Sequence, residues 1–151
     1  EYVVGRFFNT VGPRQSGMYG MVLPRFVSAA IKNETLEVHG DGSQSRTFCH
    51  VLDSIDSVSR LFFTEKAVGQ AFNIGGEGEI SINDLADKVI EITGSKSQIK
   101  YVPYNSAYPQ GFEEMMRRVP DTSKLRTYTG WSPKRNLDEI IKDIESSLRA
   151  K

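Results

Sequence analysis

The chain has 151 residues, an apolar fraction of 38%, and 19 basic side chains balanced by 19 acidic ones. This length can bury one sizeable core, so we expect one compact domain. Without a basic run or a one-sided cationic helix, the balanced charge argues against a nucleic-acid-binding or membrane-surface protein. No apolar segment has the length needed to span a bilayer. The single cysteine, Cys49, excludes an internal disulfide, has no metal-ligand spacing with either histidine, and favours a reducing cytoplasm.

The first predicted element is a buried strand formed by the apolar residues of 2–8. Because the chain begins directly in front of this strand, we expect that an N-terminal part is missing. Asn9 follows the strand and leads into the Gly12-Pro13 turn. Open α/β sheets bind ligands beyond the carboxyl ends of their strands, which makes Asn9 a candidate ligand residue. Alternatively, Asn9 satisfies backbone groups of the turn, a common role of Asn beside Gly and Pro.

Residues 23–33 have apolar side chains at helical spacing, and Pro24 suits the start of a helix. A short strand is predicted over 36–40, ending in the Gly40-Asp41-Gly42 turn. A helix is then expected from Asp53, a candidate N-cap. The apolar residues on one face of that helix are Ile55, Val58, Leu61 and Phe62.

The second half of the sequence continues this alternation. Strands are predicted over 70–76 and 98–104. The three predicted helices, with their caps, are 81–94 with Ser81, Asp84 and Gly94, 121–130 with Asp121, and 136–148 with Asn136 and Glu139. Strands that alternate with helices place the chain in the α/β class.

Two segments carry candidate anion-binding groups. The Gly40-Asp41-Gly42 turn followed by Arg46 offers backbone donors and a planar guanidinium suited to paired phosphate oxygens. The alternative is a hairpin turn with a surface arginine. In 111–121, Arg117 or Arg118 could face an anionic ligand while Glu113 accepts hydrogen bonds from hydroxyl groups. The alternative there is a set of solvated ion pairs, which contribute little.

Other reactive side chains have weaker claims to a function. His39 and His50 are expected to be structural, because no nucleophile stands at a suggestive spacing from either. Cys49 is expected to be a small buried residue, and Trp131 to anchor the last helix. The scattered serines and threonines form no recognisable nucleophile motif.

Several segments in this order carry more information together than separately: RFFNTVGPRQ, GMVLPRFVSAAIKNETLEVHGDGSQSRTFCHVLD, FNIG, RRVPDTSK and GWSPK. Across nearly the whole chain they resemble the C-terminal half of extended short-chain dehydrogenases/reductases that act on nucleotide sugars. The resemblance is greatest to the UDP-glucose 4-epimerase and UDP-glucuronate decarboxylase group. It implies that 1–151 is an α/β substrate-binding portion that includes the last strands of a Rossmann-type sheet.

The resemblance also implies residue roles. Phe8 would lie beside the nicotinamide of bound NAD, while Asn9 and Arg46 would hold two ends of one diphosphate. The other ligand residues implied are Met21 and Val22 along the nucleotide, Val38 and His39 over the uracil, Glu113 at the ribose hydroxyls and Arg118 at the phosphate.

The chain also departs from the pattern of this family. His39 replaces an aromatic residue of many relatives, Thr47 an acid, and Leu52 a polar or acidic residue, which leaves the base open. The Gly-rich dinucleotide motif and the catalytic Tyr-x-x-x-Lys pair are absent and are expected upstream of Glu1. In the family, that tyrosine takes a proton from a sugar hydroxyl while hydride passes to NAD. The chain is therefore expected to hold no catalytic residue of its own.

Two functions of different classes remain open from the sequence. The first is the UDP-sugar-binding portion of an NAD-dependent epimerase like UDP-glucose 4-epimerase, with a UDP-glucuronate decarboxylase as the alternative reaction. The second is a nucleotide-sugar-binding module without catalysis. The resemblance places the strands of 2–8 and 70–75 in the cofactor-domain sheet and those of 36–40 and 98–102 in a smaller domain. On its own, the chain is expected to bury its unpaired strands by forming a homodimer.

Overall fold

The computed structural model describes residues 1–15, 21–107 and 115–150, and its helices and strands alternate as the α/β prediction requires. The helices are α1 (Val22–Ile31), α2 (Val51–Phe62), the 3-10 helix η1 (Glu65–Ala67), α3 (Ile82–Thr93), α4 (Tyr104–Ala107), α5 (Ser123–Thr129) and α6 (Leu137–Arg149). The strands are β1 (Val4–Phe7), β2 (Thr10–Val11), β3 (Leu36–His39), β4 (Ser45–Arg46), β5 (Cys49–His50), β6 (Ala71–Ile74), β7 (Ile80–Ser81), β8 (Ile99–Val102) and β9 (Arg117–Arg118).

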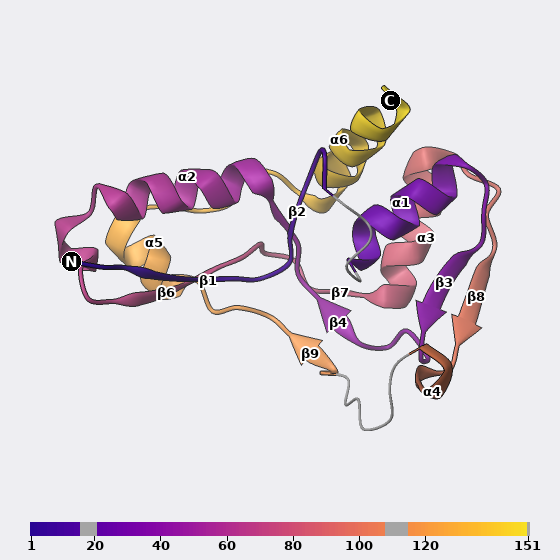
Figure 1. Cartoon of the computed structure of the whole chain (residues 1–151), viewed down its shortest axis with the longest axis horizontal. Helices are drawn as coiled ribbons and strands as arrows, with labels where there is room; N and C mark the ends of the chain where they lie inside the picture. The colour runs from indigo at the N-terminus through magenta and orange to yellow at the C-terminus, as the bar shows by residue number, and fades with distance from the viewer. Residues whose placement is uncertain (16–20, 108–114, 151) are drawn as a thin grey trace.

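The longer strands form two separate parallel pairs. Val4 to Phe7 pair in register with Ala71 to Ile74, which joins β1 to β6. Leu36 to His39 pair with Ile99 to Val102, which joins β3 to β8. Figure 1 shows these pairs at opposite ends of the molecule, with α2 and α5 near β1 and β6, and α1 and α3 near β3 and β8. The predicted division of the strands between two sheets is confirmed.

The shorter strands connect the two ends. β2 pairs with β5 in parallel, and β4 lies between β7 and β9 in a three-stranded sheet, called the small sheet below. β4 runs antiparallel to β7 and parallel to β9. Within the described ranges, no helix is both long and apolar enough to cross a membrane.

The core is divided into two clusters rather than forming the single core expected from chain length. The first lies among α1, α3, α6 and β3, whose buried residues include Phe26, Leu36, Leu85 and Ile141. The second contains Phe72 and Ile74 of β6 with residues of α2 and α5 and with Trp131. The division follows the strand pairing, because each parallel pair is covered by its own helices.

The prediction that the first strand is buried is wrong for this chain. All four residues of β1 are exposed, including Val4 at 44% and Phe7 at 50%. Ile55, Val58 and Phe62 of α2 are exposed as well, Phe62 at 81%. Two hollows of about 440 and 520 Å³ lie along these side chains. Together Phe7, Ile55, Val58 and Phe62 define the apolar face, which no described element covers.

Most helix ends follow the predicted caps. Ser81 accepts a hydrogen bond from the Asp84 amide, Gly94 ends α3 in the left-handed conformation, and Asn136 and Glu139 form a reciprocal capping box at α6. The terminal residue differs for α5, whose N-cap is Thr122, although Asp121 accepts the hydrogen bond from the Ser123 amide.

The start of α2 was predicted wrongly. Its N-cap is His50, whose Nδ1 accepts a hydrogen bond from the Leu52 amide at 3.1 Å. Asp53 lies inside the first turn and is buried, because its carboxylate faces the chain between α5 and α6. It accepts hydrogen bonds from the Lys134 and Arg135 amides and from Arg135 Nη1 at 2.6 Å.

Candidate functional site

The small sheet places two arginines next to each other. Arg46 of β4 and Arg118 of β9 are paired in the parallel register. Side chains at paired positions of neighbouring strands project from the same face of a sheet. Arg46 and Arg118, the arginine pair, therefore form a cationic edge between segments far apart in the sequence, as Figure 1 shows for β4 and β9.

Phe8 and Asn9 extend this site from the end of β1. The Arg118 guanidinium carbon lies 5.5 Å from the centroid of the Phe8 ring, within the range of a cation–π contact. The Phe8 amide donates to the Ile74 carbonyl at 2.8 Å. This backbone bond holds Phe8 at the carboxyl end of the β1–β6 pair. No carboxylate of the described residues forms an ion pair with Arg118. Its charge is thus supported mainly by an aromatic face.

Asn9 connects β1 to the segment that follows Arg46. Its backbone has a positive φ of 39°, a conformation that asparagine tolerates better than most residues. Its Nδ2 donates to the Thr47 carbonyl at 2.8 Å, and its carbonyl accepts from the Cys49 amide at 3.1 Å. One amide hydrogen of Asn9 thus serves the backbone, as the structural interpretation predicts, while no described residue donates a hydrogen bond to its side-chain oxygen.

Arg46 is half-buried rather than a fully exposed surface residue. Its Nη1 donates to the Ser45 carbonyl at 2.7 Å. Gln44, two residues before Arg46, and Thr47, directly after it, are both buried. Each has a side-chain oxygen without a hydrogen-bond partner among the described residues. A bound ligand or water would satisfy such atoms at less cost than leaving them unpaired.

The Gly40-Asp41-Gly42 turn does not form the hairpin considered from the sequence. β3 pairs with β8, whereas β4 pairs with β7 and β9. The turn instead packs on the start of α3, where Asn83 donates through its amide to the Gly42 carbonyl and through Nδ2 to the Asp41 carbonyl. Hydrogen bonds from Ser43 lower the pKa of Asp41. The turn is occupied by these contacts, which favours its structural interpretation.

The remaining predicted ligand residues lie in different environments. Val38 is fully buried in the first core cluster, and Met21 and Val22 pack against that cluster at the start of α1. Any ligand contact from Val38 would therefore involve its backbone. His39 ends β3, and its carbonyl accepts from Gln44 Nε2 at 3.0 Å, which links it to the segment before Arg46. Glu113 lies outside the described residues.

Arg117 and Arg118, either of which could face an anionic ligand according to the sequence, have different surroundings. Arg117 forms a two-pronged ion pair with Glu79, and these hydrogen bonds lower the pKa of Glu79 and raise the pKa of Arg117. Arg118 lies over Phe8 instead. The sequence did not indicate Glu79, because no local spacing connects it to a partner in a distant strand.

Other side chains with a predicted structural role are buried, but one packs elsewhere than predicted. His50 and Cys49 are buried, and burial is the main cause that lowers the pKa of His50 and raises that of the Cys49 thiol. Trp131 is buried and donates from Nε1 to the Asp53 carbonyl at 3.0 Å. It packs in the second core cluster, which contains no α6 residue, so the prediction that it anchors the last helix is wrong. Among the described residues, no group of three or more His, Cys, Asp or Glu side chains could hold a metal ion.

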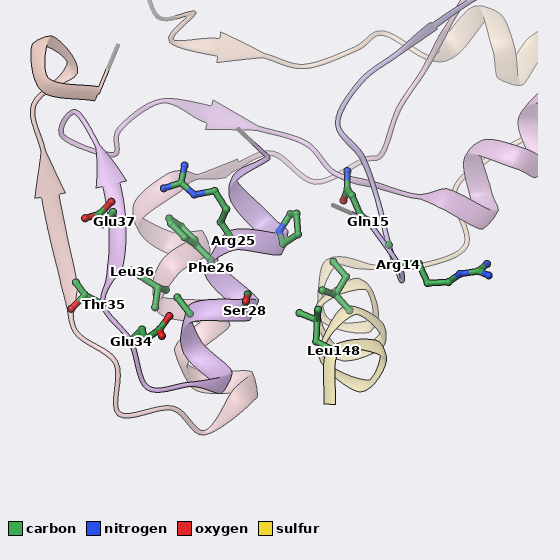
Figure 2. Close-up of a pocket in the computed structure, with 14 residues that line it drawn as sticks. Arg14, Gln15, Arg25, Phe26, Ser28, Glu34, Thr35, Leu36, Glu37 and Leu148 are labelled. Atoms are coloured by element: carbon green, nitrogen blue, oxygen red, sulfur yellow. The ribbon is translucent and has the colours of Figure 1, made fainter. Parts of the chain in front are cut away.

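A hollow of about 370 Å³ lies apart from the arginine pair, between α1, the β2–α1 connection, β3 and the end of α6. Figure 2 shows Arg25 and Ser28 of α1 and Leu148 of α6 along it. Its charges are mixed, with Arg14 and Arg25 opposed by Glu34 and Glu37, and no predicted ligand residue lines it.

Comparison with known sequences places the chain in a family. The sequence model of the GDP-mannose 4,6 dehydratase family matches residues 1–144. A UDP-N-acetyl-alpha-D-glucosaminuronate decarboxylase of Bacillus cytotoxicus is 39% identical, over 91% of this chain and 43% of that protein. UDP-glucuronic acid decarboxylase 3 of Arabidopsis thaliana is 35% identical, over 99% of this chain and 41% of that protein. The chain thus spans less than half the length of these curated relatives.

Solved structures agree with these sequence matches. UDP-glucose 4-epimerase of Thermotoga maritima, solved with UDP-glucose, has a TM-score of 0.86 and 30% identity, covering 99% of this chain and 46% of its own. UDP-glucuronic acid 4-epimerase of Bacillus cereus, in complex with UDP-glucuronic acid and NAD, has a TM-score of 0.85 and 26% identity, covering 98% and 45%. With its strand pairing and ordered motifs matched across nearly its whole length, the chain belongs to the GDP-mannose 4,6 dehydratase family of extended short-chain dehydrogenases/reductases.

Proposed function

We propose that residues 1–151 are the nucleotide-sugar-binding C-terminal portion of a longer NAD-dependent enzyme that acts on a UDP-sugar. The observation that carries this proposal is the arginine pair, held in register beside Phe8 and Asn9. Two adjacent guanidinium groups suit a diphosphate, because each can donate paired hydrogen bonds to phosphate oxygens. The relatives named for UDP-sugars support uridine as the base.

In this proposal each residue of the site has a distinct role. Arg46 and Arg118 bind the diphosphate, and the Asn9 side chain contacts the same group or the adjoining sugar. The backbone at Met21, Val22 and Val38 lines the nucleotide, because their side chains are directed to the core. His39 lies over the base, and Glu113 binds the ribose hydroxyls.

The proposed cofactor is NAD, held mainly by residues outside this chain. Phe8 fits the role predicted for it, since its half-buried ring ends the β1–β6 pair at the carboxyl edge, where such sheets bind ligands. NAD, when bound, supplies the oxidation of the sugar. The contribution of this chain is to orient the substrate beside it through Asn9 and the arginine pair.

Two reactions on a UDP-sugar are supported by different observations. The curated relatives cited above are uronate decarboxylases, which favours a decarboxylase-like lyase. The likeness to UDP-glucose 4-epimerase favours the epimerase expected from the sequence. Incubating the full-length enzyme with UDP-glucuronate and with UDP-glucose separates them, because only a decarboxylase releases CO₂ and only an epimerase returns the C4 epimer. Binding without any turnover would favour the non-catalytic module. The cytoplasmic location stays a prediction.

Substitution of Arg46 tests the binding site itself. Arg46→Ala should weaken UDP binding to the full-length enzyme by about 1.5 to 3 kcal/mol, the scale of a charge-assisted hydrogen bond. Isothermal titration calorimetry measures the change. Arg149→Ala is the matched control, because Arg149 lies at the end of α6 and pairs with Glu145. Equal UDP affinity of wild type and Arg46→Ala would remove Arg46 from the site.

A further inference from the structure

Glu79 joins all three strands of the small sheet, although it precedes β7 and was not predicted to have a role. Its carboxylate accepts from Arg117 Nε at 2.9 and 3.1 Å and from Arg117 Nη2 at 2.9 Å. It also accepts from the Ser45 hydroxyl of β4 at 2.5 Å. One side chain therefore connects the start of β7 to both β4 and β9.

Because side chains alternate along β9, the contact of Glu79 with Arg117 also determines the face to which Arg118 projects. Arg117 and Arg118 are consecutive in a strand, so they project to opposite faces. Glu79 binds Arg117 on one face together with Ser45, which is paired with Arg117. Arg118 is thereby directed to the other face, beside Arg46 and over the Phe8 ring.

The arginine pair needs such support for two reasons. Like charges on neighbouring strands repel each other, which opposes the pairing of Arg46 with Arg118. In addition, β9 has only two residues, and within the described part of the chain it is paired with β4 alone. Two residues of backbone pairing are weak compared with the entropy cost of ordering a segment.

We propose that Glu79 is a positioning residue for diphosphate binding, which holds Arg117 and β9 so that Arg118 stays beside Arg46. This inference rests on the proposed function, because it assumes that the arginine pair binds the diphosphate of a UDP-sugar. Glu79 itself contacts no ligand in this arrangement. Its effect is on affinity for the phosphate part of the ligand rather than for the base.

The chain contains a matched control two residues earlier. Glu77 is also an exposed glutamate in the loop before β7, and it also pairs with an exposed arginine, Arg126. Arg126 belongs to α5, which is no part of the small sheet. Removing either pair deletes one charge of each sign, so the long-range electrostatic effect on an anionic ligand is closely matched.

The experiment compares two double variants of the full-length enzyme, Glu79→Ala/Arg117→Ala and Glu77→Ala/Arg126→Ala. Loss of the Glu79 pair should weaken UDP binding by about three- to tenfold, because Arg118 must then be ordered when the ligand binds. Binding of uridine, measured by ligand-observed NMR, should change by less than about twofold, since uridine lacks the diphosphate. The Glu77 variant should bind both ligands as wild type does.

Each other outcome counts against a defined part of the proposal. Equal UDP affinity in the two double variants would overturn the role of Glu79 while leaving the proposed function intact. Equal weakening for UDP and uridine would show a general loss of structure, and it would also overturn the positioning role. A wild-type enzyme that binds neither UDP nor inorganic pyrophosphate would contradict the proposed function and this inference together.

Discussion

At the scale of single residues, Asp53 makes the most extensive buried polar contacts. Its side chain is 2% exposed and bonds to the Arg135 guanidinium and two backbone amides, while its carbonyl accepts from the Trp131 indole. The residue therefore connects α2 to the chain between α5 and α6. Such a carboxylate is costly to remove because its partners lose their bonds together, although the Arg135 side chain, 32% exposed, can regain part of them from water.

Asp53→Ala should accordingly lower the free energy of unfolding by about 1.5 to 3 kcal/mol, the scale of a charge-assisted hydrogen bond. Chemical denaturation of the full-length enzyme, followed by circular dichroism, measures the loss. Asp56→Ala is the control, since Asp56 pairs with Arg60 at the half-exposed surface of the same helix. That control should cost less than about 1 kcal/mol. A loss of similar size in both variants would contradict the role given to Asp53.

The residues of the candidate site were predictable to different degrees. Arg46, Arg118 and Asn9 could be chosen from the sequence because they stand in recognisable motifs near turns and strand ends. The partner of Arg117 could not, because Glu79 is distant in sequence and reaches it only through strand pairing. The burial of Val38 also depends on tertiary packing, which alternation within one strand does not determine.

At the scale of elements, helices with standard caps were predicted well and very short strands were not. α3 and α6 carry Ser or Asn caps with an acidic partner, which is a local signal. α2 begins at Val51, before the predicted Asp53, because its cap is an imidazole, which sequence rules do not include. β4, β7 and β9 have two residues each and form only by pairing with one another, so no local sequence pattern predicts them.

The imidazole cap of α2 makes the stability of this helix depend on pH. His50 Nδ1 accepts the Leu52 amide hydrogen, so the ring proton is on Nε2, 3.4 Å from Asp143 Oδ2. A second proton would have to occupy Nδ1 and would break the cap. Burial and, to a lesser extent, Arg135 lower the pKa of His50 from 6.5, while Asp143 and Asp53 oppose this shift.

The sign of the pH effect follows from this lowered pKa. Below pH 6.5 the unfolded chain binds a proton that folded His50 resists, so stability is present above that pH and falls as the pH drops toward the folded pKa. The melting temperature of the full-length enzyme, measured between about pH 5 and 7.5, should fall as the pH is lowered. His50→Asn keeps a capping oxygen without titrating and should flatten the curve, whereas His39→Gln should not. An unchanged slope in His50→Asn would contradict this explanation.

At the scale of the whole molecule, the apolar face is the dominant surface feature. Phe7, Ile55, Val58 and Phe62 are exposed together along β1 and α2. β1 pairs only with β6 among the described strands, so its other edge offers unpaired backbone groups next to this face. Exposed edges and apolar patches of this kind favour association with another chain.

The isolated chain should therefore associate with a second copy through the apolar face, most simply as a two-fold dimer. Sedimentation velocity at micromolar concentration should give twice the mass of one chain, confirmed as two copies by mass spectrometry. Phe62→Glu should shift the equilibrium toward monomer, because it places a charge in the contact. Lys142→Glu, on the exposed surface of α6, is the control and should not. A monomer of wild type under these conditions would contradict the dimer.

The register of the two parallel pairs also governs the order of events during synthesis. Val4 of β1 can pair with β6 only after Ala71 has been synthesised. Leu36 of β3 can pair with β8 only after Ile99 has been synthesised. At about 5–20 residues per second, a ribosome makes β6 several seconds after β1, so this pairing cannot form during that time. Contacts this distant in sequence also form slowly after release. The β1–β6 and β3–β8 pairings can therefore form only after the whole segment between each pair of strands has been made.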